Sequence, residues 1–229
     1  MPAVALGALS ALRGRRVFHP VGVAYRARCH VAVGDPQILP PGDHDAVVRF
    51  SRGAGLPTSL PDVLGIAVKL HGLGHDDGDQ DFLLASSASP PGVRRLLLPR
   101  RGFPGRRFSS ILAYRFDGHD PILIGALLWG PESRLDDPQR APRLPGGVIH
   151  IEAAGRFGDW RGVGRLDIGE RLPLPMSDEL RFDPWATSDA LVPTGLLNAV
   201  RAPAYRASQF ARLFLGWRQA DPKETDTRT

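Results

Sequence analysis

Residues 16–31 read RVFHPVGVAYRARCHV, and this stretch gives the clearest indication of the fold. His19 follows Arg16 by three positions, and Gly22 comes three positions later. From Gly22 to Val31 apolar side chains fall on alternate positions, which is the period of a strand with one buried face. The stretch therefore predicts a long strand that is preceded by a histidine.

Further segments with strand character follow it along the chain, and 26 Gly and 22 Pro residues separate them, as in turn-rich β structure. Residues 46–51, AVVRFS, predict a compact strand, and residues 93–98 predict a short helical piece. Three antiparallel pairs are predicted. They comprise residues 65–70 with 81–85, residues 109–116 with 122–129, and residues 148–153 with 163–168.

The 229 residues are expected to form a single mainly β (α+β) domain, because β-barrels of this length commonly have one core. Residues 1–15 predict a short apolar arm, residues 203–218 a C-terminal helix, and residues 221–229 a flexible tail. The predicted helix carries an apolar stripe at helical spacing. The stripe consists of Phe210, Leu213, Phe214 and Trp217.

The chain is basic, with a net charge of +5 and a pI of about 10.1. Lysine occurs only at Lys69 and Lys223, so almost all positive charge comes from arginine. The arginines are scattered and match no nucleic-acid recognition motif, so no nucleic-acid partner is expected. No apolar run reaches the roughly 18 residues that a membrane-spanning helix needs, so no membrane association is expected.

Cys29 is the single cysteine, so the chain alone cannot form an intramolecular disulfide. The apolar N-terminus lacks a positively charged region and a convincing cleavage site, so no signal peptide is predicted. Both features favour the reducing cytoplasm as the location.

Three blocks of the sequence, taken together, resemble the haem-dependent catalase superfamily. Residues 16–31 are similar to its R-V-x-H-x-x-G stretch, and residues 48–70, VRFSRGAGLPTSLPDVLGIAVKL, to its R-F-S and D-x-x-G-x-A-x-K sequence. Residues 182–209 resemble the segment that follows the barrel, in which an F-D-P-like turn leads to a helix. The resemblance implies an antiparallel β-barrel core of catalase-like type with flanking helices.

The resemblance also implies a set of site residues for haem b. His19 matches the distal histidine, the acid–base group that moves a proton between the two peroxide oxygens. Ser51 matches the serine that orients that histidine through a hydrogen bond. Arg16 and Arg49 match arginines that hold the haem propionates, and Phe18 and Phe50 would supply apolar surface near the porphyrin.

One departure from the family concerns the distal asparagine, which donates a hydrogen bond to peroxide. In the aligned segment DFLLASS its place is taken by Ala85 or Ser86. A serine hydroxyl can donate one hydrogen bond, whereas alanine cannot replace the amide. The sequence therefore predicts slow peroxide chemistry in place of fast dismutation.

A second departure concerns the axial ligand, which in the family is a tyrosine four residues after an arginine on one helix. Arg201 and Tyr205 have this spacing, and an arginine there would lower the pKa of the phenol. Pro203 should begin the helix, however, which would leave Arg201 outside it. Two interpretations stay open: Tyr205 is the axial ligand of the haem iron, or it is a packed helix residue and no axial tyrosine is present.

Other polar clusters have simpler interpretations. Residues 75–81, HDDGDQD, could hold a hard cation, but a solvated hairpin tip is the better interpretation of their spacing. His44 lies between Asp43 and Asp45, and neighbouring residues on a strand point to opposite sides, which argues against a hydrolytic pair. Cys29 is expected to be buried.

The sequence supports three functional hypotheses. The first is a catalase-related haem protein with slow peroxidase or peroxygenase activity, acting on peroxide or another small molecule. The second is a haem-free protein of the same fold that binds or hydrolyses another small molecule in the vacated cavity beside the barrel. The third is an interaction protein, such as a homo-oligomer formed through the stripe on residues 203–218.

Overall fold

The computed structural model describes residues 21–34, 37–53, 56–57, 59–103, 105–116, 121–129 and 147–194. The predicted arm at residues 1–15, the helix at 203–218 and the tail at 221–229 lie outside these residues. The same is true of four of the predicted site residues, namely Arg16, Phe18, His19 and Tyr205.

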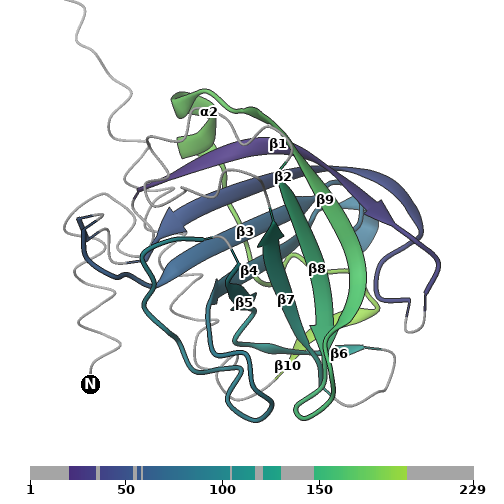
Figure 1. Cartoon of the computed structure of the whole chain (residues 1–229). Coiled ribbons are helices and arrows are strands. Elements are labelled where there is room, and N and C mark those ends of the chain that lie inside the picture. Colours follow the sequence, from purple (N-terminus) through teal and green to yellow (C-terminus); the bar gives the residue numbers. More distant parts are fainter. Residues whose placement is uncertain are drawn as a thin grey trace, which may run out of the picture. The chain divides into compact units, whose positions relative to one another are not determined.

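Within the described residues, eight strands close an antiparallel barrel in the order β1-β2-β3-β4-β5-β7-β8-β9 (Figure 1). The predicted mainly β fold with a barrel core is therefore confirmed. The barrel strands are β1 (Val21–Val31), β2 (Gly42–Arg52), β3 (Leu64–Leu70), β4 (Gln80–Ser86), β5 (Arg107–Ser109), β7 (Leu123–Trp129), β8 (Val148–Ala154) and β9 (Arg161–Arg171). A separate two-stranded sheet pairs β6 (Ala113–Phe116) with β10 (Leu191–Thr194).

Two of the predicted strand pairs form as expected. β3 pairs with β4 across the polar tip, which contains the short 3₁₀ turn η1 (His75–Asp77). β8 pairs with β9, with a bulge where Ile151 and Glu152 shift the register. The predicted strand at residues 46–51 also forms, within the longer β2.

The predicted pairing of residues 109–116 with 122–129 forms in part. Ser109 pairs with Gly125, and Tyr114 bridges to Ile122 through two backbone hydrogen bonds of 2.8 Å. The predicted continuous first strand is wrong: it is interrupted at Ile111, which has a φ of 59°, and it is divided into β5, which pairs with β7, and β6, which pairs with β10. The predicted helical piece at residues 93–98 is also wrong. It is a run of turns, and Leu97 bridges to Ser87.

Strand alternation fills the barrel with apolar side chains, as expected for an eight-stranded barrel. Tyr25, Phe50, Phe103 and Phe108 form a chain of aromatic contacts with ring centroids 5.3–5.9 Å apart. The expected place of Phe50 beside a porphyrin is therefore wrong, because its ring fills the barrel core on the face of β2 opposite Arg49 and Ser51. Cys29 lies among these core residues, as predicted, and burial raises the pKa of its thiol to about 12. It is therefore a neutral packing group.

Outside the barrel wall, the ring of Trp160 lies directly over Gly125 on β7. A Cβ at Gly125 would come within 2.4 Å of the Trp160 ring, so a side chain there would displace the indole. The guanidinium carbons of Arg94 and Arg107 each lie 4.8 Å from the ring centroid. These cation–π contacts fix the turn between β8 and β9 to the wall.

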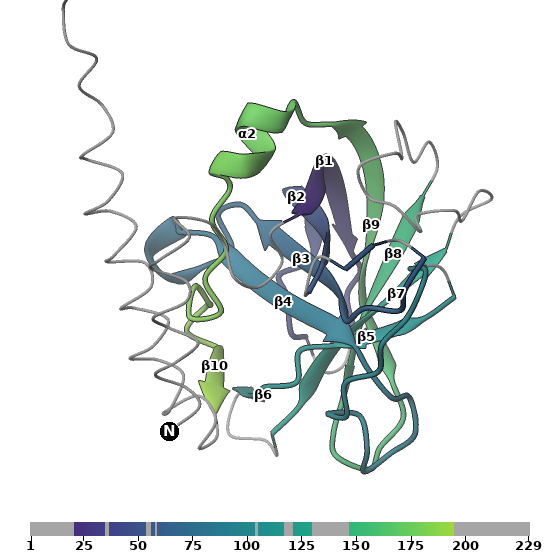
Figure 2. The same ribbon diagram turned by 90° about the vertical axis from the view of Figure 1, so that its left-hand side faces the viewer.

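After β9 the chain runs along the outer side of β1–β4 through the short helix α2 (Leu174–Glu179) and on to β10 (Figure 2). The Leu172 backbone N–H donates a hydrogen bond to the carbonyl of Ala24 on β1. Further along, the N–H of Asp81 donates to the carbonyl of Ala186. None of the helices in the described part of the chain is long and apolar enough to cross a membrane.

Candidate functional site

The outward face of β1–β4 carries the two described residues that the sequence singled out, Arg49 and Ser51. The strand registers align its side chains in cross-strand rows. One row is Gly22–Ser51–Gly65–Ala85, and the next is Ala24–Arg49–Ala67–Leu83. We call these eight residues the floor.

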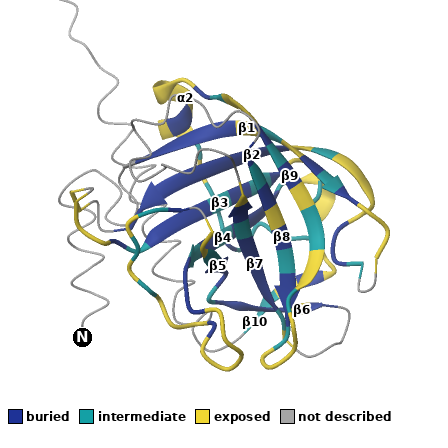
Figure 3. Ribbon diagram, in the orientation of Figure 1, coloured by how far each residue is buried: buried dark blue, intermediate teal, exposed yellow. Residues whose placement is uncertain are grey.

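Most of the floor side chains are small. The floor points away from the barrel interior, but its residues on β1 and β2 are buried, whereas Ala67, Leu83 and Ala85 on β3 and β4 are half-buried. The dark blue of β1 and β2 in Figure 3 shows this burial. Alternate positions on the same strands, such as Ile66 and Val68, point inward and are large. A face built mostly of glycine and alanine is flat, and Leu172, Leu180 and Phe182 pack over its edge at Ala24 and Val47. The small–large alternation in GIAVKL (residues 65–70) is the sequence signal for this face.

Arg49 is the charged residue of the floor and is only 4% exposed. Its guanidinium lies against Gly22: a Cβ at that position would be 2.8 Å from the Arg49 Cζ and 2.5 Å from the carbonyl oxygen of Phe50. A side chain at residue 22 would therefore push the guanidinium off the strand. Gly22 thus has a defined role, which is to let Arg49 lie close to β1.

Ser51 lies two residues beyond Arg49 on the same face and is 3% exposed. Its hydroxyl donates a hydrogen bond of 3.4 Å to the carbonyl of Gly65 in the same row. The predicted hydrogen bond from Ser51 to His19 stays a prediction, because His19 lies outside the described residues.

The structure distinguishes the two candidates for the place of the distal asparagine. Ala85 belongs to the floor, whereas Ser86 takes the opposite side of β4 and is fully buried. The Ser86 hydroxyl donates a 2.7 Å hydrogen bond to the carbonyl of Leu98 and accepts one of 3.1 Å from the N–H of Leu64. Its single proton is therefore already used. Of the two, only Ala85 lies on the face that carries Arg49 and Ser51.

A third row, Arg26–Val47–Lys69–Asp81, borders the floor. Asp81 is fully buried, with Oδ1 lying 2.9 Å from Lys69 Nζ, while Oδ2 accepts a 2.7 Å hydrogen bond from the N–H of Asp183. Burial raises the pKa of Asp81 to about 6, because it outweighs the attraction of Lys69 and the hydrogen bond. This carboxyl joins β4 to the F-D-P turn at residues 182–184.

The acidic segment at residues 75–81 is bound to its surroundings by ion pairs. Asp79 lies 3.2 Å from Lys69 and 2.9 Å from His71. His75 lies 2.6 Å from Asp189 on the chain after α2. In the portion of the chain that is described, no group of three or more acidic, His or Cys side chains is arranged to hold a metal ion.

We expect Asp81 to make the folded protein less stable as the pH rises from about 4 to about 6. Its pKa rises from 3.8 to about 6 on folding, so the folded state binds the proton more tightly, and this stabilisation is lost above the folded pKa. The difference in unfolding free energy between wild type and Asp81→Asn should fall by on the order of 3 kcal/mol between pH 4 and pH 7. Urea unfolding at several pH values measures it.

Asp79→Asn serves as the control, since its contribution has the opposite sign. Burial would raise the pKa of Asp79, but hydrogen bonds from His71 and Lys69 outweigh it, and the pKa is lowered. Stability contributed by Asp79 is present at neutral pH and is lost as the pH falls through the folded pKa. A difference between wild type and Asp81→Asn that does not change with pH would contradict the prediction.

Solved catalases share this fold. A fungal catalase aligns with a TM-score of 0.63 at 10% identity, over 88% of this chain and 60% of that chain. A bacterial catalase aligns with a TM-score of 0.59 at 12% identity, over 86% and 57% of the two chains. Catalase A from Saccharomyces cerevisiae aligns with a TM-score of 0.57 at 11% identity, over 88% and 60%.

The chain thus has a catalase-like fold, and it spans about 60% of the length of these catalases. At 10–12% identity the likeness establishes the fold alone. No family model matches the sequence, and no curated protein matches it either.

Proposed function

Proceeding from the catalase-like fold, we propose that this chain is a haem protein with slow peroxidase or peroxygenase activity. The observation that carries the proposal is the floor. It sets Arg49 and Ser51, two residues of the site implied by the resemblance, on one buried face of small side chains. His19 lies in sequence just before the strand that begins this face.

The floor residues fit a flat group that carries carboxylates. Rows of glycine and alanine would present a flat surface to a planar ring, and a buried guanidinium matches a propionate, since arginine pairs with carboxylates bidentately. Arg49 would hold one propionate, and Arg16 would hold the other. Phe18 would add apolar contact with the ring. Bound haem would supply the iron redox chemistry.

Side chains of the protein would carry out the acid–base steps. A neutral His19 imidazole accepts the proton from the first peroxide oxygen and returns it to the leaving oxygen. Ser51 is a positioning residue that holds the imidazole in the required orientation. Tyr205 is our candidate for the axial ligand.

The low rate that we expect for the reaction with peroxide follows from the side chains of Ala85 and Ser86. Alanine donates no hydrogen bond, and the Ser86 hydroxyl is held by the backbone of Leu98 and Leu64. Peroxide would therefore lack the second donor that an amide supplies. Losing one aligned donor commonly costs a factor of about 10²–10³ in rate. We accordingly propose slow oxidation of a small molecule over fast dismutation.

The cytoplasm remains our proposed location. The single cysteine and its burial in the core fit a reducing compartment, where disulfides are rare.

Titration of the purified full chain with haem is expected to give a Soret band that saturates at one haem per chain. Tyr205→Phe should shift the band and weaken binding at least tenfold, because phenolate ligation is lost. The chain has three tyrosines, and Tyr114→Phe is the matched control. Tyr114 packs in the core against Phe82, so its loss should leave the spectrum unchanged.

Two other outcomes would change the proposal. Stoichiometric binding with an identical spectrum in Tyr205→Phe would reject the axial assignment and retain the cofactor. The absence of any Soret band would reject the haem proposal. It would favour a haem-free protein that binds or hydrolyses another small molecule against the same floor.

A further inference from the structure

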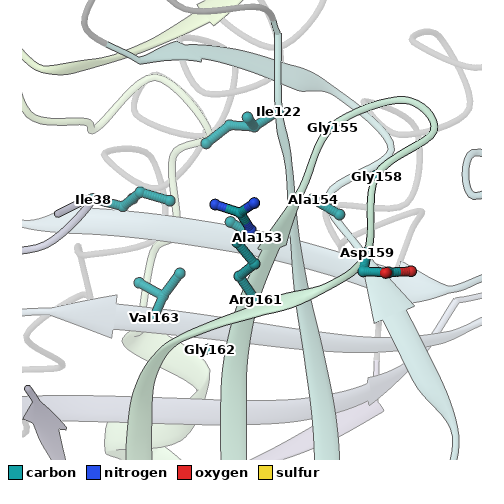
Figure 4. Close-up of a pocket in the computed structure, with 10 residues that line it drawn as sticks. All are labelled: Ile38, Ile122, Ala153, Ala154, Gly155, Gly158, Asp159, Arg161, Gly162 and Val163. Carbon is teal, nitrogen blue, oxygen red and sulfur yellow. The ribbon is translucent and has the colours of Figure 1, made fainter. Parts of the chain in front are cut away.

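A small pocket lies at the end of the barrel where the β1–β2 loop meets the turn between β8 and β9 (Figure 4). Its volume is about 190 Å³. Apolar side chains of Ile38, Ile122, Ala153 and Val163 line it, together with Arg161. None of these residues belongs to the floor on β1–β4, so the pocket is a separate feature.

Arg161 is the exposed first residue of β9, at the end of the barrel. It pairs directly with Ala153 on β8, and Ala153 is part of the hydrophobic core. Paired residues on neighbouring strands share a face, so the Arg161 side chain starts towards the interior. Figure 4 shows its guanidinium extending into the space between Ile38 and Ile122. The guanidinium thus reaches the pocket from an exposed position at its edge.

The guanidinium of Arg161 makes no hydrogen bond or ion pair with any residue in the described part of the chain. Asp159 also lines the pocket, but its carboxylate points away from this guanidinium (Figure 4). The charge of Asp159 acts instead on Arg94, whose pKa burial lowers and Asp159 partly restores. Arg161 is therefore available to an anion from solution.

Three glycines keep the pocket open, namely Gly155, Gly158 and Gly162. A Cβ at any of them would meet no atom within 4 Å, and none has a backbone φ that favours glycine. Neither packing nor backbone geometry requires glycine at these positions. They add no side chain to the rim of the pocket.

We propose that this pocket binds a small monocarboxylate with a short apolar chain. The carboxylate pairs with the Arg161 guanidinium, and the chain packs against Ile38, Ile122 and Val163. At roughly 30 Å³ for each water-sized unit, the volume holds about six non-hydrogen atoms, the size of butyrate. The pairing uses the planar fork of arginine, which matches a carboxylate.

Amide chemical shifts of the ¹⁵N-labelled full chain test this proposal with three four-carbon probes: butyrate, 1-butanol and butylamine. Butyrate should shift the amides of Gly155 and Gly162 saturably, at millimolar concentrations. The alcohol and the amine should bind at least tenfold more weakly, because neither pairs with a guanidinium. The shifts should be the same with or without added haem.

Two variants test the roles of Arg161 and Val163 in butyrate binding. Arg161→Met keeps an apolar stem and removes the charge, so butyrate affinity should fall at least tenfold. Arg165→Met is the matched control on the same strand, where Arg165 lies outside the pocket and pairs with Asp167. Val163→Phe should fill the pocket and abolish binding, with the fold checked by the spectrum of the remaining amides.

The outcomes that overturn the proposal are distinct from those that bear on haem. No saturable shift with butyrate up to 100 times the protein concentration and into the tens of millimolar would reject the site. Equal binding of 1-butanol would show an apolar pocket without anion recognition. Unchanged butyrate affinity in Arg161→Met would place the anion elsewhere.

Discussion

Replacing His19 with alanine is expected to lower the rate of peroxide-dependent oxidation by a factor of about 10²–10⁴, the usual contribution of a positioned acid–base group. The methyl group of alanine cannot accept the proton from one peroxide oxygen and deliver it to the other. The measurement is oxidation of a phenolic donor by the haem-loaded full chain, with haem content determined from the same spectrum.

His150→Ala is the matched control, because His150 is exposed on β8, away from the floor. Its rate should equal that of wild type. His19→Gln should restore a hydrogen-bond donor without restoring proton transfer, so its rate should stay near that of His19→Ala. A rate in His19→Ala within threefold of wild type, at equal haem content, would reject the acid–base role. A large fall in melting temperature with no activity to lose would point to a structural histidine.

Replacing Arg52 with leucine is expected to lower the unfolding free energy by about 3–5 kcal/mol, the cost of removing one partner of a buried ion pair. Arg52 is 2% exposed and lies 3.8 Å from the buried carboxylate of Asp62. Its guanidinium also donates hydrogen bonds to the carbonyls of Leu60, at 2.7 Å, and Leu56, at 3.2 Å. Leucine cannot donate hydrogen bonds to the carbonyls of Leu60 and Leu56. The buried carboxylate of Asp62 would also lose the positive charge of Arg52.

Urea unfolding measures the effect, with Arg101→Leu as the control. Arg101 is exposed, and its replacement should change stability by no more than about 0.5 kcal/mol. The double variant Arg52→Leu/Asp62→Leu should regain part of the loss, because it removes the buried charge as well. A loss below about 1 kcal/mol in Arg52→Leu would mean that the pair and its hydrogen bonds contribute little.

The strands could be predicted from the sequence where alternation is regular and turn residues mark the ends. β3, β4 and β8 were predicted to within one residue at each end. The prediction of one continuous strand over residues 109–116 was wrong, because the chain is interrupted at Ile111 and its two parts pair with different strands, β7 and β10. A backbone with φ of 59° at isoleucine has no local sequence signal, since β-branched residues rarely adopt it.

The sequence predicted which residues the candidate site contains, but not how they are arranged. The sequence singled out Arg49 and Ser51 through their motif, and it left Ala85 and Ser86 as equal candidates for one position. Their difference depends on the register of β4 against β3, which decides the face that each side chain occupies. The hydrogen bonds that hold the Ser86 hydroxyl come from Leu64 and Leu98, which lie 22 and 12 residues away in the chain.

By itself, the sequence determined the alternating strands, and its resemblance to the catalase superfamily implied the barrel that they form. Period-two alternation is local, so it can be read without knowing which strands meet. Only the tertiary structure decided that Gly22 receives the guanidinium of Arg49 and that Arg161 enters the end of the barrel. Both depend on which strands pair and in what register, and hydrogen bonds between distant segments set that register.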